Sequence, residues 1–332
     1  MKVSVLGAGG WGTALSILLH DNGAGVTLWA YKQEYAKELS ESRENKNYLP
    51  GVIIPHQIKV TSDIFEAVEP AEFIVVSIPS QYVREQLSTI AEVDFSNRIF
   101  INTAKGIETT TLSTMSDVVE STLKKFNRKN YVVLSGPSHA EEVSRRMPTA
   151  VVVASIHEET AERVRKLFMN AYFRVYLNND VRGVELGGSL KNIIALAAGI
   201  SDGAGFGDNT KAALMTRGMT EISRLGEILG AHQRTFSGLS GIGDLIVTCM
   251  SRYSRNRYVG EQVGAGRSLN EVLGEIKMVA EGVATTQAAM SLARKHDIEM
   301  PIVEQVNSVL FHGKDPQIAM RELMTRPGKK EY

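Results

Sequence analysis

Lys191 is the most unusual charged residue of the chain. It lies in an apolar, helix-like sequence, LGGSLKNIIALAA, at residues 186–198. Lysine is almost never fully buried unless it is paired or functional. We interpret Lys191 as a proton donor or acceptor for a carbonyl/alcohol pair, the alternative being a lysine that extends to the surface. Gly187 and Gly188 each destabilise a helix interior by about 1 kcal/mol relative to alanine. They indicate close approach of this helix to a ligand or another backbone.

A second group of polar residues follows two predicted strands. Lys105 comes directly after the strand at 98–102, and the sequence GPSHA at 136–140 follows the strand at 131–135. Ligands of open α/β sheets bind beyond the carboxyl ends of the strands. We therefore expect Lys105, Ser138 and the amides after Gly136 to contact substrate or nicotinamide. His139 has suitable chemistry for catalysis, although a histidine in such a position is more often structural.

A third group lies between residues 241 and 257. Asp244 follows a pair of glycines and is predicted to orient Lys191 or a substrate hydroxyl. Ser254, Arg255 and Asn256 supply a hydroxyl, a guanidinium and an amide in succession, a set suited to phosphate. Taken alone, this short sequence is more typical of a solvated loop.

A glycine-rich turn, GAGGWG at residues 7–12, predicts a dinucleotide-binding site. Gly7 allows the tight strand-to-helix turn, and Gly9 lets the main chain approach a pyrophosphate. Gly12 lets the following helix pack close to the strand. The free amides and the macrodipole at the start of that helix attract the anion. A plain strand–helix turn is the alternative, but the flanking strand and helix patterns favour the dinucleotide.

The end of the second strand bears on the choice between NAD(H) and NADP(H). NAD-specific domains usually place an acidic residue there to bind the ribose 2′-hydroxyl. Here the sequence is LWAYK at 28–32, with no acid before Glu34. We expect Tyr31 to lie against the adenine and Lys32 to neutralise a 2′-phosphate, which favours NADP(H) or the use of both cofactors. The alternative is that Lys32 is a solvated surface lysine.

The bulk composition excludes several classes of protein. Basic and acidic residues each total 37, so the formal net charge is zero, which argues against a nucleic-acid binder. The single cysteine, Cys249, rules out an intramolecular disulfide framework and has no neighbouring base to activate it. The seven histidines show no close metal-binding spacing. No apolar stretch is long enough to span a membrane, and we expect a cytoplasmic protein.

The chain predicts two domains. Residues 1–180 alternate strand and helix, with several wholly apolar strands, as expected of a doubly wound Rossmann domain with a parallel sheet. The predicted strands after the first one are 26–29, 58–61, 73–78, 98–102, 131–135, 150–154 and 174–176. The predicted helices between them are 11–20, 33–42, 82–91, 113–125 and 158–170.

Residues 181–332 show no strand pattern and predict an all-helical substrate-binding and catalytic domain. Its expected helices are 181–201, 210–229, 268–273, 285–296 and 302–311. Asp180 is a suitable N-cap for the first of them. With no long linker, this domain is well placed to close over the crevice at the sheet edge.

In combination, these segments resemble the bacterial-type NAD(P)-dependent glycerol-3-phosphate dehydrogenases. The similarity runs over nearly the whole chain. It comprises GAGGWGTAL at 7–15, TAKGIE at 103–108, SGPSHAEEV at 135–143, VELGGSLKNIIALAAGISDG at 184–203, GIGDLIVTC at 241–249, SRNR at 254–257 and VAEGVATT at 279–286. Several motifs in order are far more specific than any one of them.

The resemblance implies reversible hydride transfer between the nicotinamide and a small phosphorylated three-carbon substrate, and it implies roles for named residues. Lys191 matches the general acid/base, supported by Lys105 and Asp244. Substrate-binding residues by this pattern are Lys105, Gly136, Ser138, Lys191, Asn192, Asp244, Ser254, Arg255 and Asn256. Cofactor-binding residues are Gly7, Gly9, Gly10, Trp11, Gly12, Tyr31, Lys32, Tyr82, Lys105, Ala140, Arg255, Val279 and Glu281. The sequence does not fix the oligomeric state, and a homodimer is compatible with it.

Two positions depart from the family pattern. Gly10 stands where many members have serine or asparagine. Tyr31 stands where others have a basic or histidine side chain, which weakens the preference for NADP(H). Two alternative functions stay open at this point: a related dehydrogenase of a 3-hydroxy acid or ketopantoate, and a non-catalytic dinucleotide sensor.

The chemistry at Lys191 favours one direction. Reducing a ketone requires a proton donor, and lysine at its ordinary pKa of about 10.4 is protonated at neutral pH. Oxidising the alcohol requires neutral Lys191. Lowering its pKa to about 7 would need roughly 4–5 kcal/mol of destabilisation of the charged form. We expect burial and Lys105 to lower the pKa, Asp244 to oppose them, and ketone reduction, which feeds glycerophospholipid synthesis, to dominate.

Overall fold

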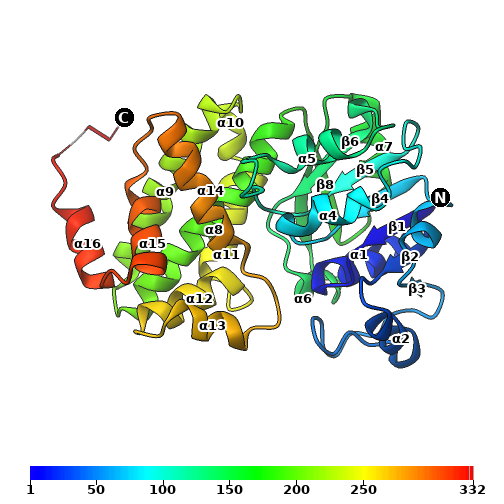
Figure 1. Ribbon diagram of the computed structural model, residues 1–332, viewed down its shortest axis with the longest axis horizontal. Coiled ribbons are helices and arrows are strands. Elements are labelled where there is room, and N and C mark those ends of the chain that lie inside the picture. The colour runs from blue at the N-terminus through cyan, green and yellow to red at the C-terminus, as the bar shows by residue number, and fades with distance from the viewer. Residues whose placement is uncertain (329, 332) are drawn as a thin grey trace.

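The computed structural model describes residues 1–328, 330 and 331, and it has two parts (Figure 1). The N-terminal part is a sheet with helices packed around it, and the C-terminal part is made of helices. The N-terminus lies beside the sheet, and the last helix, at Pro316–Met324, lies at the opposite end of the molecule (Figure 1). The boundary predicted at 180/181 falls between the last strand, which ends at Asn178, and the helix that begins at Val181.

Eight strands form one sheet in the order β3-β2-β1-β4-β5-β6-β7-β8. Its first six strands have the order typical of a Rossmann domain, so the predicted fold class is confirmed. The strands are β1 (Lys2–Leu6), β2 (Gly25–Trp29), β3 (Lys59–Thr61), β4 (Phe73–Val76), β5 (Ile99–Asn102), β6 (Tyr131–Ser135), β7 (Thr149–Ala154) and β8 (Phe173–Asn178).

The direction of the last two strands differs from the expectation of a parallel sheet. β7 runs antiparallel to β6, and β8 runs parallel to β7. A parallel connection needs a crossover that runs back along the sheet, usually a helix. Between β6 and β7 lies only the four-residue helix α6 (Ala140–Val143), which is about 6 Å long and too short for that return.

The sheet is buried on both faces. Alternate residues of β4 belong to two separate apolar clusters, Phe73 and Val75 to one, Ile74 and Val76 to the other. This explains why such strands are apolar throughout. The other helices of this part are α1 (Gly10–Asp21), α2 (Gln33–Ser42), α3 (Ile64–Val68), η1 (Ser80–Tyr82), α4 (Val83–Ser88), α5 (Met115–Thr122), η2 (Arg128–Asn130) and α7 (Glu158–Phe168).

The C-terminal part is built around one long buried helix, α8 (Val181–Gly203). Asp180 caps it as predicted, accepting a hydrogen bond from the amide of Gly183 at 2.8 Å. The surrounding helices are α9 (Asp208–Ile228), α10 (Gln233–Phe236), η3 (Leu239–Gly243), α11 (Asp244–Met250), α12 (Arg255–Gly264), α13 (Leu269–Glu275), α14 (Glu281–Lys295), α15 (Pro301–His312) and α16 (Pro316–Met324).

Helices α8 and α12 touch backbone to backbone. A Cβ added at Gly199 would lie 2.0 Å from the carbonyl oxygen of Arg257, and one at Gly260 would lie 2.2 Å from that of Leu196. Only glycine allows this approach. The sequence did not predict α11 or α12, although both are central to the arrangement, because their short apolar patterns gave no clear helical period.

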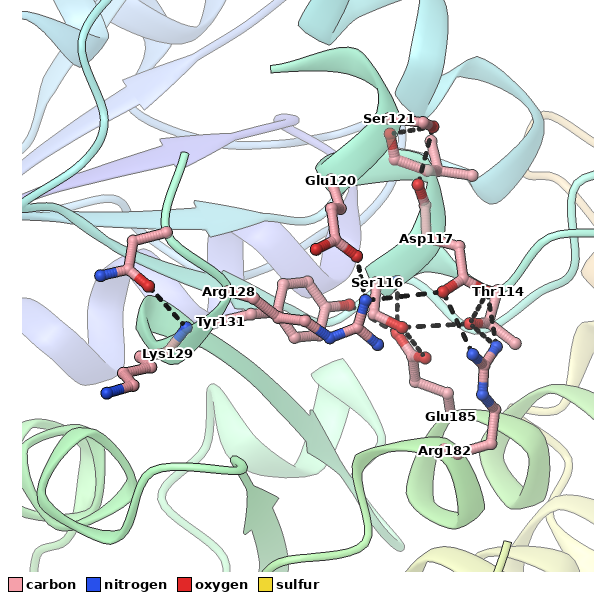
Figure 2. Close-up of polar contacts among 12 residues, drawn as sticks. Thr114, Ser116, Asp117, Glu120, Ser121, Arg128, Lys129, Tyr131, Arg182 and Glu185 are labelled. Atoms are coloured by element: carbon pink, nitrogen blue, oxygen red, sulfur yellow. Dashed lines mark hydrogen bonds and ion pairs between the residues drawn. The ribbon is translucent and has the colours of Figure 1, made fainter. Parts of the chain in front are cut away.

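A buried polar cluster joins α8 to the N-terminal part (Figure 2). Both carboxylate oxygens of Glu185 accept hydrogen bonds, one from the Tyr131 hydroxyl at 2.5 Å and the Ser116 amide at 2.8 Å, the other from the Ser116 hydroxyl at 2.7 Å. One turn earlier, Arg182 forms an ion pair with Asp117 at 2.5 Å. Burial raises the pKa of Glu185 against the effect of these hydrogen bonds. The cluster fixes α8, and with it Lys191, against the sheet.

Candidate active site

One cleft of about 840 Å³ runs between the sheet edge and the helical part. Its walls contain most of the residues that the sequence singled out. They are Gly7, Gly9, Gly10, Trp11, Tyr31, Lys32, Tyr82, Lys105, Ser138, Ala140, Lys191, Asn192, Asp244, Ser254, Arg255, Asn256, Val279 and Glu281. Two of the predicted residues, Gly12 and Gly136, do not line the cleft. They lie behind its wall, where the absence of a side chain allows close packing.

The glycine turn between β1 and α1 fits a pyrophosphate. Gly7 has φ +114°, a conformation that side chains disfavour, and a Cβ at Gly12 would lie 1.9 Å from the Gly7 carbonyl oxygen. A Cβ at Gly9 would meet nothing within 4 Å, because that position faces the open cleft. No side chain caps the start of α1. Its first amides are therefore free to bind an anion.

Tyr31 and Lys32 lie at the end of β2, where the sequence placed the adenosine end of the cofactor. Both side chains are exposed in the cleft, and Tyr31 is 64% exposed. Tyr31 meets the ring of Trp29 edge-on, with 6.1 Å between ring centroids. This leaves a face of Tyr31 and the ammonium group of Lys32 available to a ligand.

Lys191, Asp244 and Lys105 form a buried cluster at the floor of the cleft. The Nζ of Lys191 lies 2.7 Å from Oδ1 of Asp244, and the Nζ of Lys105 lies 2.6 Å from Oδ2. Lys191 also donates to the Thr248 hydroxyl at 2.5 Å, and Lys105 donates to the Gly136 carbonyl at 3.1 Å. The predicted pairing of Asp244 with Lys191 is thus present, and Asp244 pairs equally with Lys105.

Burial and neighbouring charges shift the pKa values within this cluster. Burial lowers the pKa of Lys191 to about 8, and Lys105 acts in the same direction while Asp244 opposes both. Burial would raise the pKa of Asp244, but the two ammonium groups together hold it below its ordinary value. Lys191 can therefore exist in both protonation states near neutral pH, with Asp244 ionised beside it.

Gly187 and Gly188 allow α8 to approach its surroundings, as the sequence indicated. A Cβ at Gly187 would lie 2.8 Å from the Ser240 carbonyl oxygen, and one at Gly188 would lie 2.7 Å from the Ser135 hydroxyl. The close neighbours are thus protein atoms of η3 and β6. This packing brings Lys191 to the carboxyl edge of the sheet.

His139 and Cys249 lie near this cluster. Burial lowers the pKa of His139 to about 4, so the imidazole is neutral at pH 7, and its ring lies 5.8 Å from that of Tyr253. Burial raises the pKa of the Cys249 thiol to about 12, which leaves it protonated and a poor nucleophile.

Ser254, Arg255 and Asn256 lie at the start of helix α12 rather than in a solvated loop. The Ser254 hydroxyl caps the helix by accepting from the Arg257 amide at 3.2 Å. Arg255 is exposed in the cleft, while Asn256 is buried and donates to the side-chain oxygen of Asn192 at 3.0 Å. The set combines a guanidinium with a helix N-terminus, both of which bind anions.

Glu281, at the start of α14, connects the two parts of the protein. Its carboxylate accepts from the Ser80 amide at 2.8 Å and from the Ser80 hydroxyl at 2.5 Å. Burial raises the pKa of Glu281 despite these bonds. Ser80 thus donates to both carboxylate oxygens. This contact holds α14 against the segment after β4, near Tyr82 and Ala104 of the cleft wall.

Sequence reasoning assigned no role to several residues of the cleft wall. Thr248 belongs to the same group as Asp244 in the sequence and follows it by one turn of α11. Asn47, Tyr48 and Lys277 come from loops without motif or period, and no sequence signal pointed to them. They lie in the cleft because the loops before β3 and before α14 meet across its mouth.

Comparison with known proteins agrees with this geometry. The family models for the N-terminus and the C-terminus of NAD-dependent glycerol-3-phosphate dehydrogenase match residues 2–161 and 180–321. The glycerol-3-phosphate dehydrogenase [NAD(P)+] of Chlorobium phaeobacteroides (strain BS1) is 54% identical over 331 residues, which cover 100% of this chain and 99% of that one. The chain belongs to the NAD(P)-dependent glycerol-3-phosphate dehydrogenase family.

Two further members of this family support the assignment. The enzyme of Pelotomaculum thermopropionicum is 56% identical over 327 residues, which cover 98% of this chain and 93% of that one. The crystal structure of glycerol-3-phosphate dehydrogenase from Coxiella burnetii superposes with a TM-score of 0.93 at 38% identity, covering 98% of this chain and 99% of that one.

Membership of the glycerol-3-phosphate dehydrogenase family makes this protein an NAD(P)-dependent oxidoreductase with a Rossmann domain. The prediction of an enzyme using NAD(H) or NADP(H) is confirmed. The family assignment also favours a glycerol-3-phosphate dehydrogenase over a ketopantoate or 3-hydroxy acid dehydrogenase and over a non-catalytic sensor. Within the described part of the chain, no helix combines the length and apolarity that crossing a membrane requires.

Proposed function

We propose that the protein reduces dihydroxyacetone phosphate to sn-glycerol 3-phosphate, with Lys191 as the general acid and, in reverse, the general base. The observation that carries this proposal is the buried contact of Lys191 with Asp244, 2.7 Å long, in the wall of a cleft that also contains the glycine turn. A nicotinamide cofactor supplies the hydride when bound. Lys191 supplies the proton to the carbonyl oxygen.

The neighbours of Lys191 prepare it for this role. Asp244 and Thr248 hold the Nζ of Lys191 in one position, so little reorganisation is needed when the proton leaves. Lys105, on the other oxygen of Asp244, adds a second positive charge close to the developing alkoxide. The same charge lowers the pKa of Lys191 and makes the proton easier to transfer.

We place the substrate phosphate at the start of α12. Arg255 extends into the cleft there, and Asn256 and Asn192 hold each other in place behind it. A phosphate would meet the guanidinium and the first amides of the helix. Ser138 lines the cleft as well, and the Gly136 carbonyl behind it accepts hydrogen bonds from Ser138 and Lys105.

The cofactor contacts proposed for the other residues follow the cleft from end to end. Gly9, Gly10 and Trp11 would bind the pyrophosphate. Tyr31 and Lys32 would bind the adenosine end, and the nicotinamide half would contact Tyr82, Ala140, Val279 and Glu281.

We further propose that ketone reduction is the dominant direction and that it feeds glycerophospholipid synthesis in the cytoplasm. We also propose that the active protein is a homodimer.

A substrate panel tests the proposed function. Purified protein is given NADPH or NADH with dihydroxyacetone phosphate, dihydroxyacetone, ketopantoate or acetoacetate, and oxidation of the reduced cofactor is followed. We expect turnover on the phosphorylated ketone far above the others. The variant Lys191→Met should lose turnover yet bind the reduced cofactor normally. Turnover near wild type in that variant would remove Lys191 from the mechanism.

A further inference from the structure

Lys277 bridges the mouth of the cleft. It lies in the loop between α13 and α14 of the helical part, and its Nζ donates to the side-chain oxygen of Asn47 at 3.0 Å. Asn47 belongs to the N-terminal part, in the loop between α2 and β3. Both residues line the cleft, and Lys277 is exposed. The contact therefore connects two walls that are 230 residues apart in sequence.

The loop that carries Asn47 is fixed directly onto the glycine turn. The side-chain Nδ2 of Asn45 donates to the Ala8 carbonyl at 3.0 Å and to the Thr13 hydroxyl at 2.7 Å. The Tyr48 carbonyl oxygen lies 2.6 Å from where a Cβ of Gly10 would stand. Asn47, between these anchors, is thus held beside the start of α1, and so is the ammonium group bonded to it.

The charge of Lys277 has no acidic partner among the described residues. Its hydrogen-bond partner is a neutral amide, and within the described chain no carboxylate forms an ion pair with it. Glu275, two residues away, pairs with Arg267 instead. A cation near the uncapped start of α1 favours the binding of an anion there.

We propose that Lys277 is a binding residue for the diphosphate of the dinucleotide, exchanging the Asn47 oxygen for a phosphate oxygen when the cofactor enters. The diphosphate is preferred over the 2′-phosphate because Asn45 and Tyr48 place Lys277 at the glycine turn. Lys32, at the end of β2, lies where a 2′-phosphate would be expected. Lys277 then contributes equally to NADH and NADPH binding, whereas Lys32 distinguishes them.

The test measures dissociation constants for NADH and NADPH by nicotinamide fluorescence, without substrate. Lys277→Gln keeps a hydrogen-bond donor for Asn47 but removes the charge. We expect it to weaken both cofactors by the same factor, about tenfold, as for the loss of one charge-assisted hydrogen bond. Lys46→Gln is the matched control, an exposed lysine of the same loop outside the cleft wall, and should leave both constants unchanged.

Asn47→Ala separates ligand binding from a purely structural bridge. It breaks the contact but leaves the cation, so cofactor binding should stay at the wild-type value. Losses in Asn47→Ala equal to those in Lys277→Gln would overturn the proposal, as would a loss confined to NADPH or no loss in Lys277→Gln. The proposal rests on the proposed function only in that the protein must bind NADH or NADPH. The dissociation constants of the wild-type protein test that binding separately. Thermal unfolding without cofactor checks that the variants fold.

Discussion

The ammonium groups of Lys191 and Lys105 bind opposite oxygens of a single carboxylate, that of Asp244. Two cations thus share one anion in a buried place. Desolvation destabilises the charged form of Lys191 more than that of Lys105, because the Lys191 side chain is 6% exposed while that of Lys105 is 20% exposed. The shared carboxylate explains why burial lowers the pKa of Lys191 without turning it into a permanently neutral amine.

The pH dependence of the two directions should differ in sign. With a Lys191 pKa of about 8, the protonated form needed for ketone reduction declines as pH rises through 8. The neutral form needed for alcohol oxidation increases over the same range, from about a tenth at pH 7. Measuring kcat/KM for both directions between pH 6 and 10 checks this. Oxidation as fast at pH 7 as at pH 9, or as fast as reduction at pH 7, would contradict it.

Replacing Asp244 should affect both rate and pH profile. Asp244→Asn removes the carboxylate that raises the pKa of Lys191, so the pKa should fall below 8. We expect kcat for ketone reduction to fall by about 100-fold at pH 7, since the proton donor loses both charge and orientation. The alkaline limb of the profile should move to lower pH. A reduced rate with an unmoved pH profile would limit Asp244 to a structural role.

Arg255 should decide recognition of the phosphate. Arg255→Ala should raise KM for dihydroxyacetone phosphate by about 100-fold, as expected for the loss of a charged hydrogen-bond pair. Turnover of unphosphorylated dihydroxyacetone should barely change. Arg257→Ala is the neighbouring control, because Arg257 pairs with Asp202 and does not line the cleft. Equal losses on both substrates would show that Arg255 is structural.

The Glu185 cluster should contribute strongly to stability. Glu185→Ala leaves the Ser116 amide and the Tyr131 hydroxyl buried without this acceptor and removes a bond of the Ser116 hydroxyl, which should lower the free energy of unfolding by about 3 kcal/mol. Tyr131→Phe removes one donor and should cost about 1 kcal/mol. Urea unfolding measures both, with the exposed Glu120→Gln as control. A Glu185→Ala value no larger than the control would show that the cluster does not hold the domains together.

Local patterns predicted much of the fold. The helix at 33–42 has the expected bounds, and the apolar strands lie within one or two residues of their predicted positions. These elements depend on residue type and short-range period, which a single sequence carries. The antiparallel β7 and the helix α12 were not predicted. The direction of β7 depends on the short connection after β6, and the place of α12 depends on its glycine contacts with α8.

The sequence by itself determined the dinucleotide turn at Gly7–Gly12, the buried Lys191 and the family, because each depends on residue identity at fixed spacing. Only the tertiary structure decided that Asp244 pairs with two lysines, that Glu281 accepts hydrogen bonds from Ser80 and that Lys277 donates one to Asn47. These pairs join residues 139, 201 and 230 positions apart. No local period records such a contact, because it exists only after the sheet and the helices have packed.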